Sequence, residues 1–253
     1  FSSLLKILDD HTLYNFFSQS FQKGSFQFQP DDVQGMFRLT SCFNDEDRED
    51  FMCKLCDTNM IKEVISSRKF NSAAGPDGID YSIFKLAEEE ATTFIQCIMK
   101  TVISYKRVPK AWKDSNMSLI YKKGDMNSPC NWRPISISNA IYRIFSCIFA
   151  KTINSFNSRL LIYSSNQKGF LEKINGCSDN SSIISELYYD AMRNHKSLYI
   201  TALDLQNAFG SVDHEMILQC LREKGFPDDF IKTIKDIYQG STTKIITHKF
   251  TSK

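Results

Sequence analysis

The distribution of apolar and polar positions predicts a chain of helices interrupted by a β-hairpin. Apolar residues recur at helical spacing in residues 4–17, 58–69, 82–105, 139–160, 179–194 and 213–224. Shorter runs rich in β-branched and aromatic residues predict strands at 117–121 and 132–138, joined as a hairpin by a long basic tip, and a further strand at 197–205. Residues 243–253 also have the composition of a strand, but the sequence indicates no partner for it. This mixture predicts an α+β fold.

Capping residues predict where several of these helices begin or end. Asp57 is placed to cap the helix that follows it, and either Ser178 or Asp179 can cap a later one. Gly225 occupies the position where a left-handed residue closes a helix, and Pro227 fits the first turn of another. These capping signals support the predicted helices independently of the pattern of apolar residues.

Composition and length restrict the class of protein. The chain has 253 residues, of which 42% are hydrophobic, and its 31 basic side chains nearly balance its 29 acidic ones. At roughly 150 residues per domain, this length predicts one or two globular domains. The apolar runs are far shorter than the ~20 residues that span a bilayer, so we expect no membrane segment. Because the chain begins at Phe1 rather than Met, we expect it to be a piece of a longer protein.

The small net charge of +2 hides an uneven distribution. Residues 100–151 contain ten basic side chains and two acidic ones, a local charge of +8. The aromatic residues interleaved with these charges are Trp112, Tyr121, Trp132 and Tyr142. This composition is typical of a surface that meets a phosphate backbone and stacks on bases, and an ordinary basic face is the alternative. Residues 44–50 contain five acids and one arginine, and we expect a solvated surface segment there.

Two cysteines, Cys53 and Cys56, have the spacing of half a zinc site. Since no second cysteine pair or neighbouring histidine completes that site, we interpret them as thiols on one helix face that behave as small buried hydrophobic side chains. The other cysteines are scattered and no signal peptide is visible, so we expect free thiols in a reducing compartment.

The predicted strand at 197–205 carries a carboxylate near its end. A buried Asp204 is costly unless a partner or a metal neutralises it, and carboxylate oxygens are the ligands that Mg²⁺ selects. Two such ions about 4 Å apart are the usual device for in-line nucleotidyl transfer, but one carboxylate alone cannot hold both. The alternative is that Asp204 caps the turn that follows it.

Four motifs, in this order along the chain, resemble the reverse transcriptases of non-LTR (LINE-type) retrotransposons. Residues 74–79, AGPDGI, resemble a signature in the N-terminal fingers of that family. Residues 119–125, LIYKKGD, and 131–136, NWRPIS, resemble its second fingers motif. Residues 167–170, QKGF, are similar to the block before the catalytic strand, and 202–214, ALDLQNAFGSVDH, look like the first catalytic motif. An ordered set of motifs is far more specific than any single one.

The resemblance implies a truncated right-hand polymerase that contains the fingers and the first part of the palm. We expect an N-terminal extension at 1–57, fingers at 58–196 and a partial palm at 197–253. The commonest family form has Asp where this chain has Gly210, a position that is not a metal ligand, so we expect tolerance there. The next catalytic strand of the family, an aromatic-x-Asp-Asp hairpin with the other two carboxylates, is absent from this sequence.

The activity implied by the resemblance is RNA-directed DNA synthesis by two-Mg²⁺ nucleotidyl transfer, primed at a nicked chromosomal target. The implied partners are template RNA, primer or target DNA, deoxynucleoside triphosphates and the remainder of the same polyprotein, with its palm, thumb and endonuclease. The implied site of action is nuclear, after cytoplasmic synthesis. Because the second carboxylate motif is missing, we expect the isolated chain to be inactive.

The same resemblance assigns roles around the reacting nucleotide. Asp204 would bind both Mg²⁺ ions, and the carbonyl of Leu205 would complete one coordination shell. Asn207 and Ala208 would lie along the triphosphate through backbone groups. Phe209 would place its ring under the sugar and so exclude a 2′-hydroxyl, although a core aromatic is the alternative for this residue.

Charged and polar residues of the fingers would bind the triphosphate and the nucleic acid. Arg133, with a planar fork, and Lys122, as a point charge, would hold the incoming triphosphate. Solvent-facing or structural roles are the alternatives for both. The expected nucleic-acid contacts are Lys123, which is also the substitute for Lys122, together with Arg143, Gln167, Gly169 and Phe170.

Two rival interpretations stay open. The first is a non-catalytic, nucleic-acid-binding fragment or a domesticated reverse-transcriptase-like module, which the missing carboxylates favour. The second is a structural assembly subunit that makes protein contacts through the acidic residues 44–50. Salt-dependent RNA binding distinguishes them, because affinity for phosphates falls steeply with salt.

Overall fold

The computed structural model describes residues 10–21, 42–205 and 208–246. The helices are α1 (Asp10–Phe21), α3 (Asp45–Lys54), α4 (Thr58–Ser66), α5 (Ser82–Leu86), α6 (Glu88–Tyr105), α7 (Ala140–Leu160), α8 (Gly176–Arg193), α9 (His214–Lys224) and α10 (Asp228–Tyr238), with short 3-10 turns η2 (Lys110–Lys113) and η3 (Pro129–Asn131). The strands are β1 (Asp114–Tyr121), β2 (Trp132–Ser138) and β3 (Thr242–Ile245). The predicted α+β fold is confirmed. None of the helices in these ranges has the length and hydropathy of a membrane-spanning segment.

The strands form one sheet in the order β2-β1-β3. The predicted hairpin is confirmed: β1 and β2 are antiparallel, with Tyr121 opposite Trp132. The C-terminal strand, which the sequence left without a partner, pairs in parallel with β1, so that Thr242 lies opposite Asp114. Its hydroxyl donates to the Asp114 carboxylate across 128 residues of sequence. A pairing of that separation leaves no local signal, because parallel strands require a long crossover connection.

One hydrophobic core joins α3, α4, α6, α7, α9 and α10, which together we call the body. Its centre is aromatic: the Phe51 ring meets the Phe230 ring edge-on at 5.1 Å, and Phe43 lies 4.7 Å from Phe226. Phe43 and Phe51 belong to the predicted N-terminal extension, and Phe226 and Phe230 belong to the predicted palm. The same core also contains residues of the predicted fingers, so it connects all three parts. The domain bounds therefore stay a prediction.

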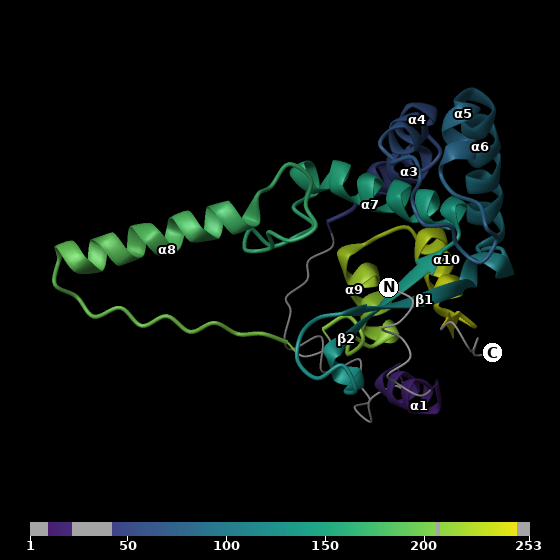
Figure 1. Ribbon diagram of the computed structural model, residues 1–253. Helices are drawn as coiled ribbons and strands as arrows, with labels where there is room; N and C mark the ends of the chain where they lie inside the picture. The colour runs from purple at the N-terminus through teal and green to yellow at the C-terminus, as the bar shows by residue number, and fades with distance from the viewer. Residues whose placement is uncertain (1–9, 22–41, 206–207, 247–253) are drawn as a thin grey trace.

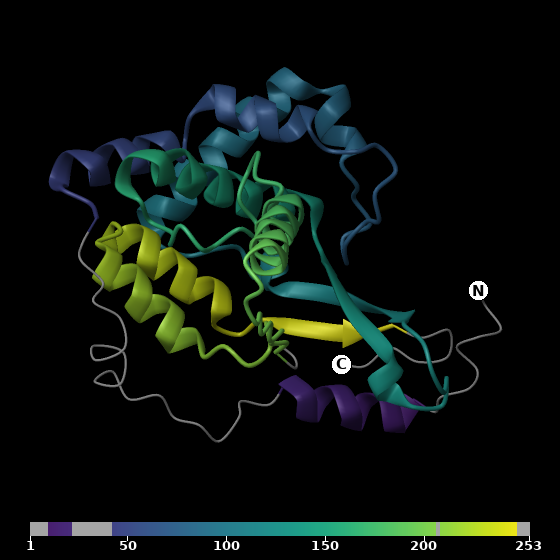
Figure 2. The same cartoon turned by 90° about the vertical axis from the view of Figure 1, so that its left-hand side faces the viewer.

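A second, smaller cluster packs α1 against the sheet. Leu13 and Phe17 of α1 are buried with Met117, Trp132 and Ile245. Figure 2 shows α1, in purple, on the side of the strands away from α3–α6. The predicted helix at 4–17 thus exists as α1, although its residues 4–9 lie outside the described ranges.

The segment 161–205, which we call the arm, leaves the body. Figure 1 shows α8 projecting from the rest of the molecule and the chain returning alongside it without a neighbouring strand. Within α8 only Ala191 is buried. The prediction of a strand at 197–205 is wrong, since these residues form no strand and are exposed throughout. A strand is stable only when its backbone groups are paired, and no described strand lies beside this segment.

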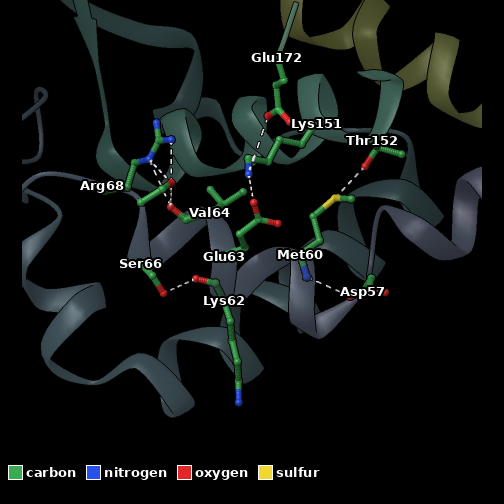
Figure 3. Close-up of polar contacts among 11 residues, drawn as sticks. Asp57, Met60, Lys62, Glu63, Val64, Ser66, Arg68, Lys151, Thr152 and Glu172 are labelled. Atoms are coloured by element: carbon green, nitrogen blue, oxygen red, sulfur yellow. Dashed lines mark hydrogen bonds and ion pairs between the residues drawn. The ribbon is translucent and has the colours of Figure 1, made fainter. Parts of the chain in front are cut away.

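Lys151 of α7 connects the body to the start of the arm. Its ammonium contacts Glu63 of α4 at 2.5 Å and Glu172 of the arm at 3.8 Å, as Figure 3 shows. Burial by itself lowers the pKa of Lys151, but the hydrogen bond to Glu63 and the charge of Glu172 outweigh it, so the pKa is raised. The ammonium therefore stays charged between the two carboxylates.

Several predicted helix ends differ from those observed. Asp57 caps α4 as predicted, accepting from the Met60 backbone at 2.9 Å, but α4 ends at Ser66 rather than near Lys69. The helix predicted at 82–105 is broken at Ala87, whose backbone leaves the helical region (φ −122°, ψ 55°). Asn175, not Ser178 or Asp179, caps α8. The predicted helix end at Gly225 is confirmed.

The acidic and cysteine-containing segment also differs from its prediction. Asn44 and Asp47 form a capping box at the start of α3. Asp47 is buried and pairs with Arg159 at 2.8 Å, so this acid is structural rather than solvated. Because α3 ends at Lys54, Cys53 and Cys56 do not share a helix face, and the Cys53 thiol is exposed rather than buried.

Candidate active site

The tip of the hairpin is held in shape by its own hydrogen bonds. The Lys122 backbone donates to the Asn131 carbonyl at 2.8 Å, and the Trp132 indole donates to the Met126 carbonyl at 3.0 Å. Gly124 has φ +96°, a backbone conformation that favours glycine, and a Cβ there would lie 2.8 Å from the end of the Asn131 side chain, which would have to shift. The basic tip is therefore a shaped loop in which the Lys122 and Lys123 side chains are exposed.

The two faces of the hairpin have different surroundings. Met117 and Trp132 belong to the face that α1 covers. Arg133 lies opposite Ile120 in the register, and both are exposed. Because side chains alternate along a strand, Arg133 is on the face opposite Trp132, together with the exposed Ile135. The predicted triphosphate ligand Arg133 is thus on the free face of an edge strand.

Asp204 lies in the exposed return segment of the arm rather than at the end of a buried strand. The argument that burial demands a neutralising metal therefore does not hold in this structure. Leu205 is exposed as well, and Asn207 lies outside the described residues. The roles assigned to these three residues stay predictions.

Phe209 and Gly210 line a cavity of about 680 Å³ beside the sheet. Met117 and Ser136 of the hairpin and residues of α1 also line this cavity, as do the stacked rings of His214 and Tyr238, whose centroids lie 4.1 Å apart. Burial raises the pKa of Tyr238, so its hydroxyl stays neutral. The structure thus brings the predicted sugar-gating residue beside the hairpin that carries Arg133, but next to the opposite face.

Phe170 meets Phe209 from the arm. Their ring centroids lie 6.0 Å apart with the planes at 73°, an edge-to-face contact between two exposed side chains. Gln167 donates to the Gly169 carbonyl at 2.9 Å, which shapes the turn before Phe170. Ala208, beside Phe209, is also exposed. Two motifs separated by about forty residues of sequence therefore meet at Phe209.

The two tryptophans of the basic stretch are not available for base stacking. Trp112 and Trp132 are 6% and 5% exposed, and they pack in the two hydrophobic clusters. Arg143 donates to the Ala73 carbonyl at 2.7 Å, and its guanidinium lies over the Tyr81 ring at 4.5 Å. These contacts favour a structural role for Arg143, and its nucleic-acid contact stays a prediction. Burial therefore removes the two tryptophans from the expected surface, and contact of the basic stretch with nucleic acid stays a prediction.

Sequence reasoning missed Asn139, which is 4% exposed at the junction of β2 and α7. Its side-chain NH₂ donates to the Ala111 carbonyl at 3.0 Å, and its side-chain oxygen accepts from the Asp77 backbone at 3.3 Å. The only sequence signal was an asparagine before a helix, which suggests a local cap rather than these contacts.

The described residues supply few ligands for a metal. Among them, no three His, Cys, Asp or Glu side chains gather into a group that could hold an ion. The carboxylate of Asp204 and the carbonyl of Leu205 are hard oxygen donors, the kind a divalent cation prefers, but they are too few for two ions. The described residues thus offer the right type of ligand for a divalent cation, but too few ligands for two ions.

Comparison with known proteins agrees with the motifs. A family profile described as reverse transcriptase (RNA-dependent DNA polymerase) matches residues 120–253, more than half of the chain. The Pol polyprotein of the R2 element of Nasonia vitripennis is 30% identical over 73% of this chain and 17% of its own length. That of R2DM from Drosophila melanogaster is 29% identical over 69% of this chain and 16% of its own length.

A more distant relative covers more of the chain. The probable RNA-directed DNA polymerase from transposon X-element of Drosophila melanogaster is 24% identical over 88% of this chain and 25% of its own length. The chain thus spans about a sixth to a quarter of the curated relatives named here. The chain belongs to the reverse transcriptase family, in the group carried by non-LTR retrotransposons.

Proposed function

We propose that the protein containing this chain is an RNA-directed DNA polymerase that copies its RNA from a primer at a nicked chromosomal target. One observation carries the proposal: Phe209 of the first catalytic motif lies beside the fingers hairpin and in ring contact with Phe170, so three separately recognised motifs converge. The substrates are an RNA template, a DNA primer and deoxynucleoside triphosphates. The site of action is the nucleus, where that target is found, and synthesis is cytoplasmic.

The roles of individual residues follow from their chemistry. Arg133 and Lys122, exposed near the hairpin tip, hold the triphosphate, and Lys123 is the substitute for Lys122. Phe209 limits space at the sugar. The Phe170 turn, with Gln167 and Gly169, approaches the template.

Reverse transcriptases generally use divalent metal ions. We propose Mg²⁺ at Asp204 and the Leu205 carbonyl, because both are hard oxygen donors. The remaining carboxylates of a two-ion site come from outside the described residues, and the rest of the polyprotein is the partner that supplies them. When bound, such ions favour attack by the primer oxygen and departure of pyrophosphate.

Primer extension by the full-length protein on an RNA template tests the proposal. We expect Asp204→Asn to lower the rate about a thousand-fold, because a neutral amide holds a divalent cation poorly. Asp190→Asn is the matched control, since Asp190 is also an exposed arm carboxylate, and it should retain the rate. Normal extension by Asp204→Asn would contradict the metal assignment.

A non-catalytic RNA-binding module is the second candidate. It is favoured by the exposed basic tip of the hairpin and by the lack of a three-membered ligand group among the described residues. Filter binding to RNA over a salt series, with a primer-extension assay on the same preparation, separates the two. Salt-sensitive binding without extension by full-length protein would favour this candidate.

A further inference from the structure

Asn139 stands where a helix cap is expected but does not cap. Asparagine before a helix normally accepts a hydrogen bond from the backbone of the second or third helical residue. The Asn139 side chain makes no such bond to α7. Its amide instead joins two segments that lie 28 and 62 residues away, through Ala111 and Asp77. Capping therefore does not explain this buried side chain.

Asn139 closes the base of the hairpin. Ala111 lies in η2 just before β1, and Asn139 directly follows β2, so the bond between them joins the two ends of the hairpin. The opposite end of the ladder is the pair Tyr121 and Trp132, next to Lys122. The Asn139 bond and the basic tip therefore lie at opposite ends of the same two strands.

The turn at residues 75–78 packs against the base of the hairpin at Asn139. A Cβ at Gly75 would lie 2.6 Å from both the Cα and the backbone nitrogen of Asn139, so no larger residue fits without a backbone shift. Arg143, one turn further along α7, donates to Ala73 just before the turn. The turn is itself closed by the bond from the Gly78 backbone to the Gly75 carbonyl at 3.1 Å. Steric contact and hydrogen bonds thus hold the turn against the start of α7.

We propose that Asn139 is a positioning residue that fixes the orientation of the hairpin, and with it Lys122 and Arg133, relative to the body. Its NH₂ group holds the η2 side and its oxygen holds the 75–78 turn, so one amide sets the angle at which the hairpin leaves the body. The consequence for nucleotide binding rests on the proposed function, whereas the consequence for hairpin order does not.

Hydrogen exchange on the full-length protein tests the positioning itself. Asn139→Asp keeps an acceptor for Asp77 but removes the donor to Ala111, so amides of residues 114–138 should exchange several-fold faster. Asn175→Asp is the matched control: Asn175 caps α8 by accepting from Ser178, and aspartate does the same. Unchanged exchange of the hairpin in Asn139→Asp would overturn the proposal.

Steady-state kinetics of the same variants tests the consequence for the nucleotide. We expect Asn139→Asp to raise the KM for deoxynucleoside triphosphates about three- to tenfold, the range of one lost hydrogen bond, with kcat little changed. Gly75→Ala should give the same KM effect, and the double variant should be less than additive because both act on one contact. A lower melting temperature in both variants, with KM and hairpin exchange both unchanged, would show a merely structural role and overturn the proposal.

One further variant separates this inference from the proposed function. If hairpin exchange rises in Asn139→Asp while Arg133→Ala leaves the KM unchanged, the positioning stands and the triphosphate site at Arg133 fails. If Asn139→Asp prevents folding, Asn139→Ser is tested in its place. Serine can cap α7 but reaches neither Ala111 nor Asp77. It is expected to repeat the faster exchange, and normal protection would again overturn the proposal.

Discussion

Helices α7 and α8 are both amphipathic and similar in length, at 21 and 18 residues, yet their surroundings differ completely. In α7, Ile144, Ile148 and Thr152 are fully buried in the body. In α8, the apolar residues Ile184, Leu187 and Tyr188 are about half exposed. An apolar stripe therefore predicts a helix and its inward face, but it does not identify which element of the fold packs against that face.

The difference continues beyond the two helices. Two later segments show the same need for a partner. The segment after α10 pairs with β1 and becomes strand β3, whereas residues 197–205, after α8, lie beside no described strand and form none. Asp204, near the end of the arm, and Phe209, which follows the arm in sequence, are both exposed. Substitutions that change burial in the body should therefore have larger effects than the same substitutions in the arm.

The largest effect is expected from matched truncations in the two helices. Ile148→Ala should lower the free energy of unfolding by about 2–5 kcal/mol, because it leaves a cavity in the body. Ile184→Ala should change it by less than about 0.5 kcal/mol, since that side chain is 46% exposed. Urea unfolding measures both, and helix propensity cancels in the pair. Equal losses of unfolding free energy would show that α8 is packed in solution, and that the two helices do not differ in burial.

A smaller effect is expected at the junction of the arm and the hairpin. In the full-length protein, Phe209→Val should lower discrimination against ribonucleotides by about tenfold or more, because the space under the sugar is enlarged. Single-nucleotide incorporation with matched deoxy- and ribonucleotides measures this. Phe94→Val, at an exposed ring of α6, is the control and should retain selectivity. Unchanged discrimination in Phe209→Val would indicate that its ring contact with Phe170 is purely structural.

The smallest effect is expected at the link between the body and the arm. The hydrogen bond from Lys151 lowers the pKa of Glu63, so the pair stabilises the folded chain at neutral pH and this contribution is lost as pH falls through the folded pKa. Lys151→Met should lose less than about 1 kcal/mol at pH 7, and less still near pH 3. Thermal unfolding against pH measures the difference.

A second exposed pair provides the control for that measurement. Lys232 and Asp228 form an exposed pair 3.7 Å apart, with both residues on α10 of the body. Lys232→Met should therefore leave the mobility of the arm unchanged, whereas Lys151→Met should speed proteolysis after Lys196. Equal cleavage rates in the two variants would show that Lys151 does not hold the arm to the body.

Local signals predicted most of the elements. The hairpin, α4 with its Asp57 cap, α7 and the end of α9 at Gly225 all follow from spacing and caps within a few residues. The order of the motifs predicted the family. The helix predicted at 82–105 failed only at Ala87, where α5 and α6 meet and no glycine or proline marks the break.

Local sequence signals were enough to predict most of the helices, the hairpin and the family, because those signals act over a few neighbouring residues. The roles of the individual site residues stay predictions. Three features became visible only in the folded chain: the burial of Trp112 and Trp132, the pairing of β3 with β1, and the bonds by which Asn139 joins Ala111 to Asp77. The physical reason is that burial and pairing depend on partners distant in sequence, and neither a periodic pattern nor a cap specifies which partner is met.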